Sequence, residues 1–276
     1  MSEPVLYEQS GVHAALRRIG GMVLRHWYVI RSSVPRTAEL VFWPLVSMLM
    51  WGFLQTYLAR TTSLAARAAG LFVGGILLWD ILVRSQLGYA VAFLEEIWAR
   101  NLGHLMMSPL RPAELVASLI VVSLIKLLVA MVPVAFLAYA FFGFNLLSLG
   151  FAFAAFFANL VIMSWALGLI STGAVLRWGM AAESIAWLIV FMLLPIACVF
   201  YPVSTLPDWM QPLALALPPT YVFEGLRALV LEHTFRSDHM VRALVLNLVY
   251  LTFSYTLFHA LLQSARTNGS LVQMGE

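Results

Sequence analysis

The sequence is poor in charged residues. They make up 11% of the 276 residues, whereas hydrophobic residues make up 62%, and the mean hydropathy is +0.90. About a quarter of the residues of soluble domains are charged, so this composition excludes an ordinary water-soluble domain. Because roughly 20 apolar residues cross a hydrocarbon core of about 30 Å, the chain has room for about six crossings and for no large soluble domain.

Cysteine and lysine are almost missing, since Cys198 and Lys126 are the only residues of their types. A single cysteine excludes a disulfide or a thiolate metal cluster within one chain. The other basic residues are arginines, a bias that is typical of GC-rich bacterial genes. They are scattered between apolar stretches, so the net charge of +3 does not indicate a nucleic-acid partner.

Motifs for nucleotide binding and catalysis are also absent from the sequence. It contains no GxxxxGK[ST] loop, no internal repeat, and no recognisable Ser/His/Asp or paired-carboxylate constellation. We therefore expect no enzyme activity and no metal or cofactor bound by this chain. Any ATP chemistry must reside on another polypeptide.

Long apolar stretches dominate what the sequence does contain. They predict an all-α integral membrane protein with six transmembrane helices, near residues 38–59, 68–94, 114–142, 148–176, 184–201 and 240–264. More arginines flank the side that carries residues 1–37 and 265–276 than the other side, so both termini are predicted to be cytoplasmic. We expect a multi-pass protein of a bacterial cytoplasmic membrane, with residues 38–264 as its transmembrane domain.

The segment before the first span is amphipathic. Residues 12–34 place Leu16, Ile19, Val23 and Trp27 at helical spacing among several arginines. This pattern predicts a helix that lies flat at the membrane interface in contact with lipid headgroups, or a helix packed on protein.

A polar stretch separates the second and third spans. In residues 95–115, charged and apolar residues alternate at helical spacing until Pro109 stops the helix. Pro112 suits a first helical position and Glu114 a first turn, so the third span should start there. The stretch predicts a cytoplasmic helix over 95–108, either in contact with a partner or a passive connection.

The loop before the last span contains two short apolar runs, 207–217 and 220–231. Each run gives about 16 Å of helix, too little to cross a membrane. Pro218 and Pro219 break the pair in the middle, and Pro202 and Pro207 limit its entry. We predict an extracytoplasmic re-entrant helical hairpin over 202–233, with a pair of interfacial helices as the alternative.

These two segments together resemble a known family. The Glu95-Glu96-x-x-x-Arg100-Asn101-Leu102 stretch that ends in Ser108-Pro109-Leu110, and the Pro202-Val203-Ser204 to Leu206-Pro207 stretch that leads into Leu217-Pro218 and Tyr221-x-x-Glu224-Gly225-Leu226-Arg227, resemble the membrane subunits of ABC-2 type (ATP-binding-cassette) exporters. The resemblance covers nearly the whole chain.

The resemblance implies a homodimeric permease that works with two copies of a separate ATPase subunit, which bind ATP and Mg²⁺. The helix over 95–108 would lie in a groove of the ATPase, with Glu95, Glu96, Arg100, Asn101 and His104 facing it. The hairpin would form an extracytoplasmic gate that includes Pro202, Pro207, Trp209, Pro218, Tyr221, Glu224 and Arg227. The substrate would be amphipathic, lipid-like or another small molecule.

Three charged residues fall inside predicted spans. Asp80 and Arg84 are four residues apart on one helix, and Lys126 lies at a similar depth on the next. Each is costly in the bilayer, so they predict an intramembrane polar cluster that lines the pathway, or a structural ion pair. An ion-coupled secondary transporter that uses Asp80, Arg84 and Lys126 is the alternative function, and an intramembrane enzyme would need a nucleophile and a base that the sequence does not reveal.

Two further patterns in the sequence are weaker. Gly70 and Gly74 form one GxxxG, which favours close helix contact but is weak evidence for a dimer seam. Glu232, His233, Asp238 and His239 gather before the last span, but their spacing matches no zinc motif. We interpret them as solvated loop residues.

Overall fold

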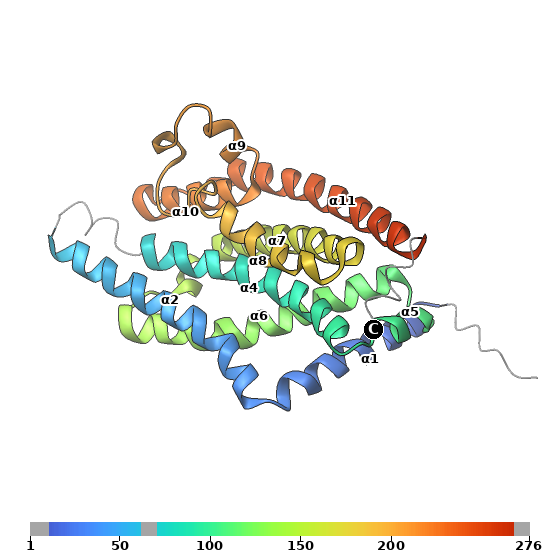
Figure 1. Cartoon of the computed structure of the whole chain (residues 1–276). Coiled ribbons are helices and arrows are strands. Elements are labelled where there is room, and N and C mark those ends of the chain that lie inside the picture. Colours follow the sequence, from blue (N-terminus) through green and yellow to red (C-terminus); the bar gives the residue numbers. More distant parts are fainter. Residues whose placement is uncertain (1–10, 62–70, 268–276) are drawn as a thin grey trace, which may run out of the picture.

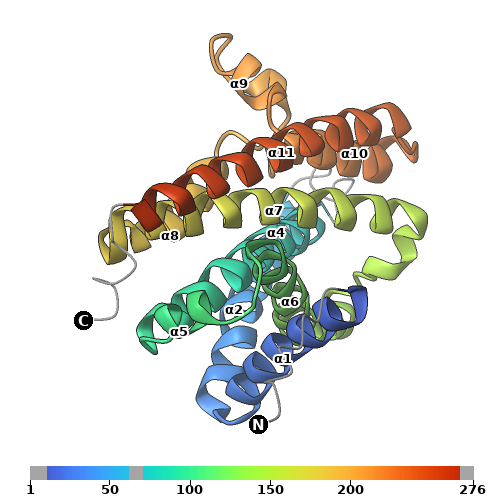
Figure 2. The same ribbon diagram turned by 90° about the vertical axis from the view of Figure 1, so that its right-hand side faces the viewer.

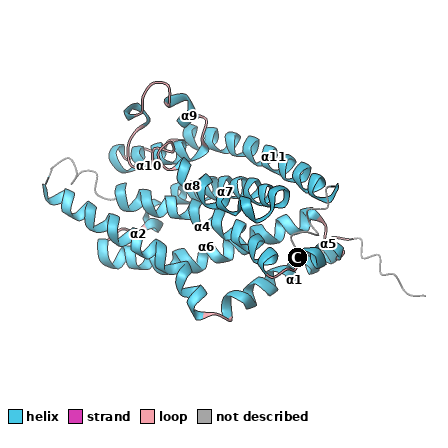
Figure 3. Cartoon of the chain, viewed as in Figure 1, coloured by secondary structure: helices cyan, strands magenta, loops and turns pink. Residues whose placement is uncertain are grey.

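The computed structural model describes residues 11–61 and 71–267, and Figure 1 shows their arrangement. All regular structure in this part of the chain is helical, with no strand (Figure 3). The α-helices are α1 (Val12–Arg31), α2 (Val34–Thr61), α4 (Leu71–Trp98), α5 (Leu102–Met107), α6 (Pro112–Phe142), α7 (Phe151–Trp178), α8 (Glu183–Leu193), α9 (Gln211–Leu215), α10 (Pro218–Glu232) and α11 (Ser237–Thr267). The predicted amphipathic helix corresponds to α1.

Five stretches of the described residues are long and apolar enough to cross a membrane. They are Thr37–Arg60, Leu71–Trp98, Pro112–Phe142, Phe151–Leu193 and Ser237–Thr267. The first three and the last correspond to predicted spans, and the fourth covers residues 151–176 of the predicted span 148–176 together with the start of the predicted span 184–201. As predicted, α6 has proline in its first turn and the Glu114 carboxylate at its start.

The predicted span 184–201 is only partly helical. The 43-residue stretch Phe151–Leu193 is interrupted at Gly179, where φ is 68°, and α8 then packs against α7. Helix α8 has 11 residues, so its length of about 16 Å is half of a hydrocarbon core. It ends just before Pro195, which lacks the amide hydrogen that a continuing helix needs.

Helix α4 forms the centre of the bundle. In its most apolar window 83% of the residues are buried, compared with 17% in α2 and in α11. Helices α2, α6, α7, α8 and α10 all pack against α4. Figure 2 shows α7 and α11 side by side, crossing over α4 and α6. Helix α4 is therefore shielded by protein, whereas α2 and α11 leave apolar faces uncovered.

The bundle has two distinct ends. At one end, Met22 of α1, Leu102 of α5, Leu115 of α6 and Leu262 of α11 share one hydrophobic cluster; we call it the α5 end (Figure 1). At the other, α10 packs on α11, α7 and α4, and we call it the α10 end. Helix α9 projects beyond α11 in both views, and its Ala214 packs with Cys198 and Leu206 in a small separate cluster. The α10 arm of the predicted hairpin thus packs on the bundle, and the α9 arm packs on the segment between α8 and α9.

Glycines allow α4 to approach its neighbours closely. A Cβ on Gly168 of α7 would lie 2.6 Å from Cδ1 and 3.1 Å from Cβ of Tyr89, whose side chain is fully buried. Nearer the α10 end, a Cβ on Gly74 would meet Phe144 and Leu226, so Gly74 packs within the chain. Gly70, the other half of the GxxxG, lies outside the described residues.

Substituting Gly168 is expected to destabilise the bundle. The added methyl of Gly168→Ala has no space beside the anchored Tyr89 ring, and overpacking of this kind costs about 1–3 kcal/mol. Gly20→Ala in α1 is the matched control because a methyl group added there would have no atom within 4 Å. The fraction of purified protein that stays monodisperse after heating would measure the difference. Equal heat resistance of both variants would contradict the close packing of α4 on α7.

Candidate transport pathway

A cavity of about 910 Å³ runs beside α4, between α2, α6 and α8. Its wall includes Trp98 near the α5 end and Ile76 near the α10 end. These two residues are separated by about 33 Å of helix, which matches a hydrocarbon core of about 30 Å. The cavity therefore extends over the depth of a membrane.

Aromatic and charged side chains share the wall of this cavity. Helix α2 contributes Trp43 and Trp51, α4 contributes Trp79 and Trp98, and α8 contributes Trp187. The charged residues of the wall are Glu39, Asp80, Arg84, Glu95 and Lys126. The surface is thus amphipathic, with large apolar faces and a few fixed charges.

The predicted intramembrane charges line the same cavity but do not form one cluster. Lys126 Nζ lies 3.2 Å from both carboxylate oxygens of Glu95. Glu95 lies about 22 Å further along α4 than Asp80. The ion pair between Lys126 and Glu95 is therefore far from Asp80. Asp80 Oδ2 and Arg84 Nε are buried without a hydrogen-bond partner among the described residues.

A second group of charges ties α1 to α4 and α6 at the α5 end. Arg18 donates to both oxygens of Glu114, over 2.8 and 2.6 Å, and this hydrogen bond raises the pKa of Arg18 above its usual range. Arg25 forms an ion pair with Glu96. Arg18 and Arg25 are seven residues apart and so share a helix face, which is the signal in the sequence that could have identified them.

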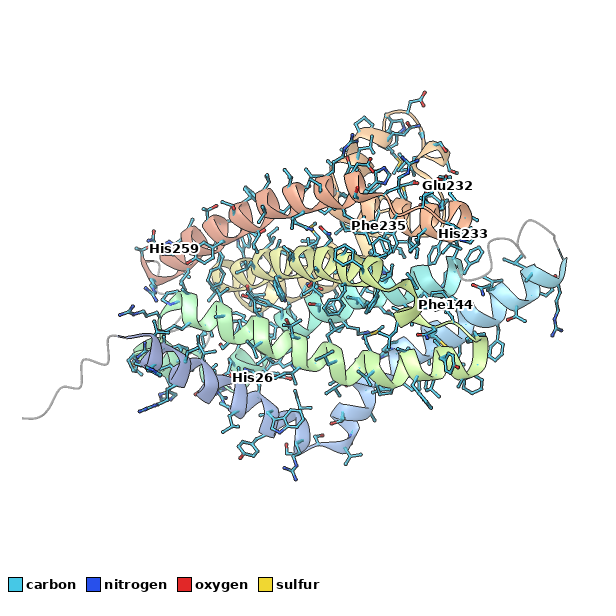
Figure 4. The ribbon with its side chains drawn as sticks, turned by 180° about the vertical axis from the view of Figure 1, so that it is seen from behind. His26, Phe144, Glu232, His233, Phe235 and His259 are labelled. Carbon is cyan, nitrogen blue, oxygen red and sulfur yellow. The ribbon has the colours of Figure 1, made fainter. Side chains whose placement is uncertain are left out.

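His26 is the centre of this group. It is 2% exposed and lies where α1 meets α6 (Figure 4). Its Nδ1 is 3.3 Å from Glu95 and its Nε2 is 3.2 Å from Glu96. The imidazole therefore lies between the two carboxylates, with its hydrogen bond to Glu95, and Glu95 also pairs with Lys126. We call His26, Glu95, Glu96 and Lys126 the carboxylate cluster. His26 is not among the residues predicted from the sequence to form a site.

The predicted coupling residues separate into buried and exposed groups. Glu96 is 2% exposed and accepts a hydrogen bond from Asn101 Nδ2 over 2.8 Å, whereas Arg100 and His104 are exposed. The stretch 95–108 is not one helix, because residues 95–98 end α4 and α5 begins at Leu102. Arg100 has a φ of 54° and the Asn101 amide bonds to the Glu96 carbonyl, an arrangement that ends a helix.

At the α10 end, Glu224 and Arg227 tie α10 to the segment that follows α8. Arg227 Nη2 donates to the carbonyls of Cys198 and Tyr201, each over 2.9 Å. Glu224 Oε1 accepts from the Val203 amide over 2.9 Å and lies 2.9 Å from Arg227 Nη1. We call this set of contacts the α10 latch.

The other predicted gate residues surround the α10 latch. Pro218 starts α10, Pro202 precedes the short 3₁₀ turn Val203–Thr205, and the Pro207 carbonyl accepts from the Met210 amide. Tyr221 donates its hydroxyl to the Leu215 carbonyl over 2.9 Å, joining α10 to α9. Trp209 is 71% exposed, so it lies on the surface of the projecting arm.

No group of three or more His, Cys, Asp or Glu side chains among the described residues could hold a metal ion. Glu232 and His233 lie at the corner between α10 and α11 (Figure 4), and His239 lies 3.7 Å from Asp238. Their neighbour Phe235 contacts Phe151 edge to face, so apolar packing fixes this corner.

Comparison with known proteins gives the family. The ABC-2 type transporter profile matches residues 27–231, a range that starts in α1, ends in α10 and contains the cavity, α5 and the α10 latch. No curated protein is significantly similar to the chain. Proteins of this family are multi-pass membrane permeases, transport subunits that partner an ABC ATPase and do not hydrolyse ATP themselves. Since the match covers most of its length, the chain belongs to the ABC-2 type transporter family.

Proposed function

We propose that the chain is one half of the pore of an exporter, in which two identical copies enclose the pathway and two separate ATPase subunits supply the energy. The observation that carries this proposal is the cavity of about 910 Å³ beside α4, because it extends over the depth of a membrane and ends near α5. ATP and Mg²⁺ would bind to the ATPase, with no cofactor on this chain. An amphipathic or lipid-like small molecule would suit the mixed wall.

The sixth crossing is part of this proposal. Gln86 Nε2, in the middle of α4, donates to the Ala186 carbonyl over 3.0 Å, whereas a Cβ on Gly75 would lie 3.4 Å from the Val199 carbonyl. Residues 186–199 therefore follow α4 for about 16 Å towards the α10 end. A half-helix continued by an irregular segment is tolerated in a membrane where protein shields it.

The proposed orientation places the α5 end in the cytoplasm of a bacterium. Helix α1 lies at this end with Arg17, Arg18, Arg25 and Arg31, and arginines concentrate on the cytoplasmic side of membrane proteins. The α10 end, with its hairpin over 202–233, would then be extracytoplasmic. Helices α2 and α8 would meet the second copy, since Phe42, Trp43, Phe191 and Met192 leave apolar surface exposed there.

Contact with the ATPase would occur at α5. Arg100 and His104 are exposed, and Trp98 and Met107 are 50% and 78% exposed, so this surface combines apolar and basic groups. Behind this surface, the buried Glu96 carboxylate accepts a hydrogen bond from Asn101, the residue before α5. A force applied to α5 would thereby reach α4 and the carboxylate cluster.

Charge reversal of this surface is expected to release the ATPase. We expect the variant Arg100→Glu/His104→Glu to retain about tenfold less ATPase than the original chain when both are purified in mild detergent. The matched control is Arg236→Glu/Arg242→Glu, which changes exposed residues at the α10 end. An equal loss in the control variant would contradict a coupling role for α5.

The ion-coupled alternative makes a different prediction. It requires Asp80, Arg84 and Lys126 to relay ions, and transport would then continue without an ATPase and stop with an uncoupler. Family membership and the pairing of Lys126 with Glu95 favour the ATP-driven function.

A further inference from the structure

The charges on the cavity wall are not balanced. Glu39, Asp80 and Glu95 are acidic, whereas Arg84 and Lys126 are basic. Lys126 is paired with Glu95, and Arg84 interacts electrostatically with both Asp80 and Glu39. One negative charge therefore remains in excess, on the part of the wall formed by α2 and α4.

Asp80 is the most deeply buried acidic residue of this set and lies one helical turn from Arg84, whose Nε also has no hydrogen-bond partner among the described residues. Asp80 is 3% exposed, yet its Oδ2 has no hydrogen-bond partner among the described residues, and it lines the cavity. A buried polar atom without a partner is rare in folded proteins because its desolvation is not compensated. A ligand that donates to Asp80, or carries a positive charge, would compensate it.

The aromatic side chains of the wall favour the same kind of ligand. Trp43, Trp51, Trp79, Trp98 and Trp187 come from α2, α4 and α8. The face of an indole ring attracts cations, most strongly where water is excluded, and Trp79 is the buried member of these five, at 3% exposed. A volume of about 910 Å³ is in the range of pockets that hold drug-sized molecules.

We propose that the cavity binds amphipathic organic cations, with the Asp80 carboxylate as the counter-ion and the tryptophans as the wall for the apolar body. This inference rests on the proposed function, since it names the class of substrate that the exporter carries. Lipid-like anions, neutral lipids and glycolipids would be poor ligands, because they carry no positive charge to pair with the excess carboxylate.

Tetraphenylphosphonium and tetraphenylborate provide the test, because they have nearly the same shape and opposite charges. Equilibrium dialysis of the purified full chain in detergent, corrected with empty micelles, would measure both affinities. We expect at least tenfold tighter binding of the phosphonium. Asp80→Asn should lower the affinity for the phosphonium about tenfold without lowering the affinity for the borate. Asp208 is an exposed aspartate at the α10 end, so the control Asp208→Asn should change neither affinity.

A second variant keeps the test decisive if Asp80→Asn does not fold. Glu39 is exposed on α2, so Glu39→Gln should fold normally and reduce the preference for phosphonium about threefold. Borate binding that equals or exceeds phosphonium binding, or a preference that neither variant changes, would overturn the proposal. If the cation preference is absent while the ATPase still co-purifies, only this inference fails; if the ATPase is absent while the preference holds, only the proposed coupling fails.

Discussion

Replacing Lys126 with methionine is expected to destabilise the chain strongly, although methionine suits an apolar span. Lys126 is 4% exposed, and its ammonium group lies 3.2 Å from Glu95. Removing one partner of a buried ion pair costs about 3–5 kcal/mol, because the other charge stays buried. The Glu95 side chain is 14% exposed, so we expect the lower end of that range. The unfolding free energy of the purified chain, followed by tryptophan fluorescence during SDS titration, would measure the loss.

A double variant separates the ion pair from the packing of the lysine side chain. In Lys126→Met/Glu95→Gln neither partner is charged, and the amide can still bond to His26 Nδ1, which lies 3.3 Å from the Glu95 carboxylate. We expect the double variant to recover most of the stability, giving a favourable coupling energy in the double-mutant cycle. Strictly additive effects of the two substitutions would show that the pair does not stabilise the fold.

The partner of Lys126 could not be predicted from the sequence, because the direction of its side chain depends on how α4 and α6 are oriented. Equal depth in the membrane led to the prediction that Asp80 and Lys126 meet. Side chains of a helix lean towards its N-terminus, and the N-termini of α4 and α6 lie at opposite ends of the bundle. A Cβ on Gly88 would lie 3.5 Å from Lys126 Cβ, so Lys126 starts midway along α4 and extends away from Asp80.

The burial of Glu95 and Glu96 could not be predicted from the stretch 95–108, because the residues that cover them lie in α1, about 70 residues earlier in the sequence. Glu95 and Glu96 look like the polar face of a surface helix, but α1 covers them with Arg25 and His26. Periodicity cannot tell a carboxylate that faces water from one that faces a cation of another helix. In the sequence, the exposed Arg100 and His104 alternate with apolar residues in the same way as the buried Glu95 and Glu96 do.

Hydropathy predicted the long helices well because their apolar length is a direct requirement of the bilayer. It failed for the end of the predicted span 184–201, where apolar residues continue beyond the helix. Ala197, Cys198 and Val199 are buried against other parts of the chain. Their apolar character reflects packing at the α10 end, which a hydropathy window does not distinguish from a helical span.

Replacing Arg227 with leucine is expected to open the α10 latch without unfolding the bundle. The guanidinium holds the carbonyls of Cys198 and Tyr201 and the Glu224 carboxylate. Hydrogen bonds to charged groups contribute about 1.5–3 kcal/mol, so a loss of about 2 kcal/mol is expected. Cys198 is the only cysteine and is fully buried, so its reaction with N-ethylmaleimide reports opening at this point. The reaction should accelerate about 30-fold, as this energy implies.

Two further variants distinguish local opening from a general loss of stability. Arg236→Leu is the matched control, because Arg236 is 48% exposed and lies 3.9 Å from the exposed Glu232; it should leave the labelling rate unchanged. Glu224→Gln can still accept from the Val203 amide but loses the ion pair, so it should accelerate labelling less than Arg227→Leu does. If Arg227→Leu labels no faster than the original chain, the latch does not hold α10 against the segment after α8, and a gating role for the α10 latch is contradicted. If labelling accelerates while the SDS-titration midpoint stays within error, the α10 end opens independently of the bundle, as an exit gate requires.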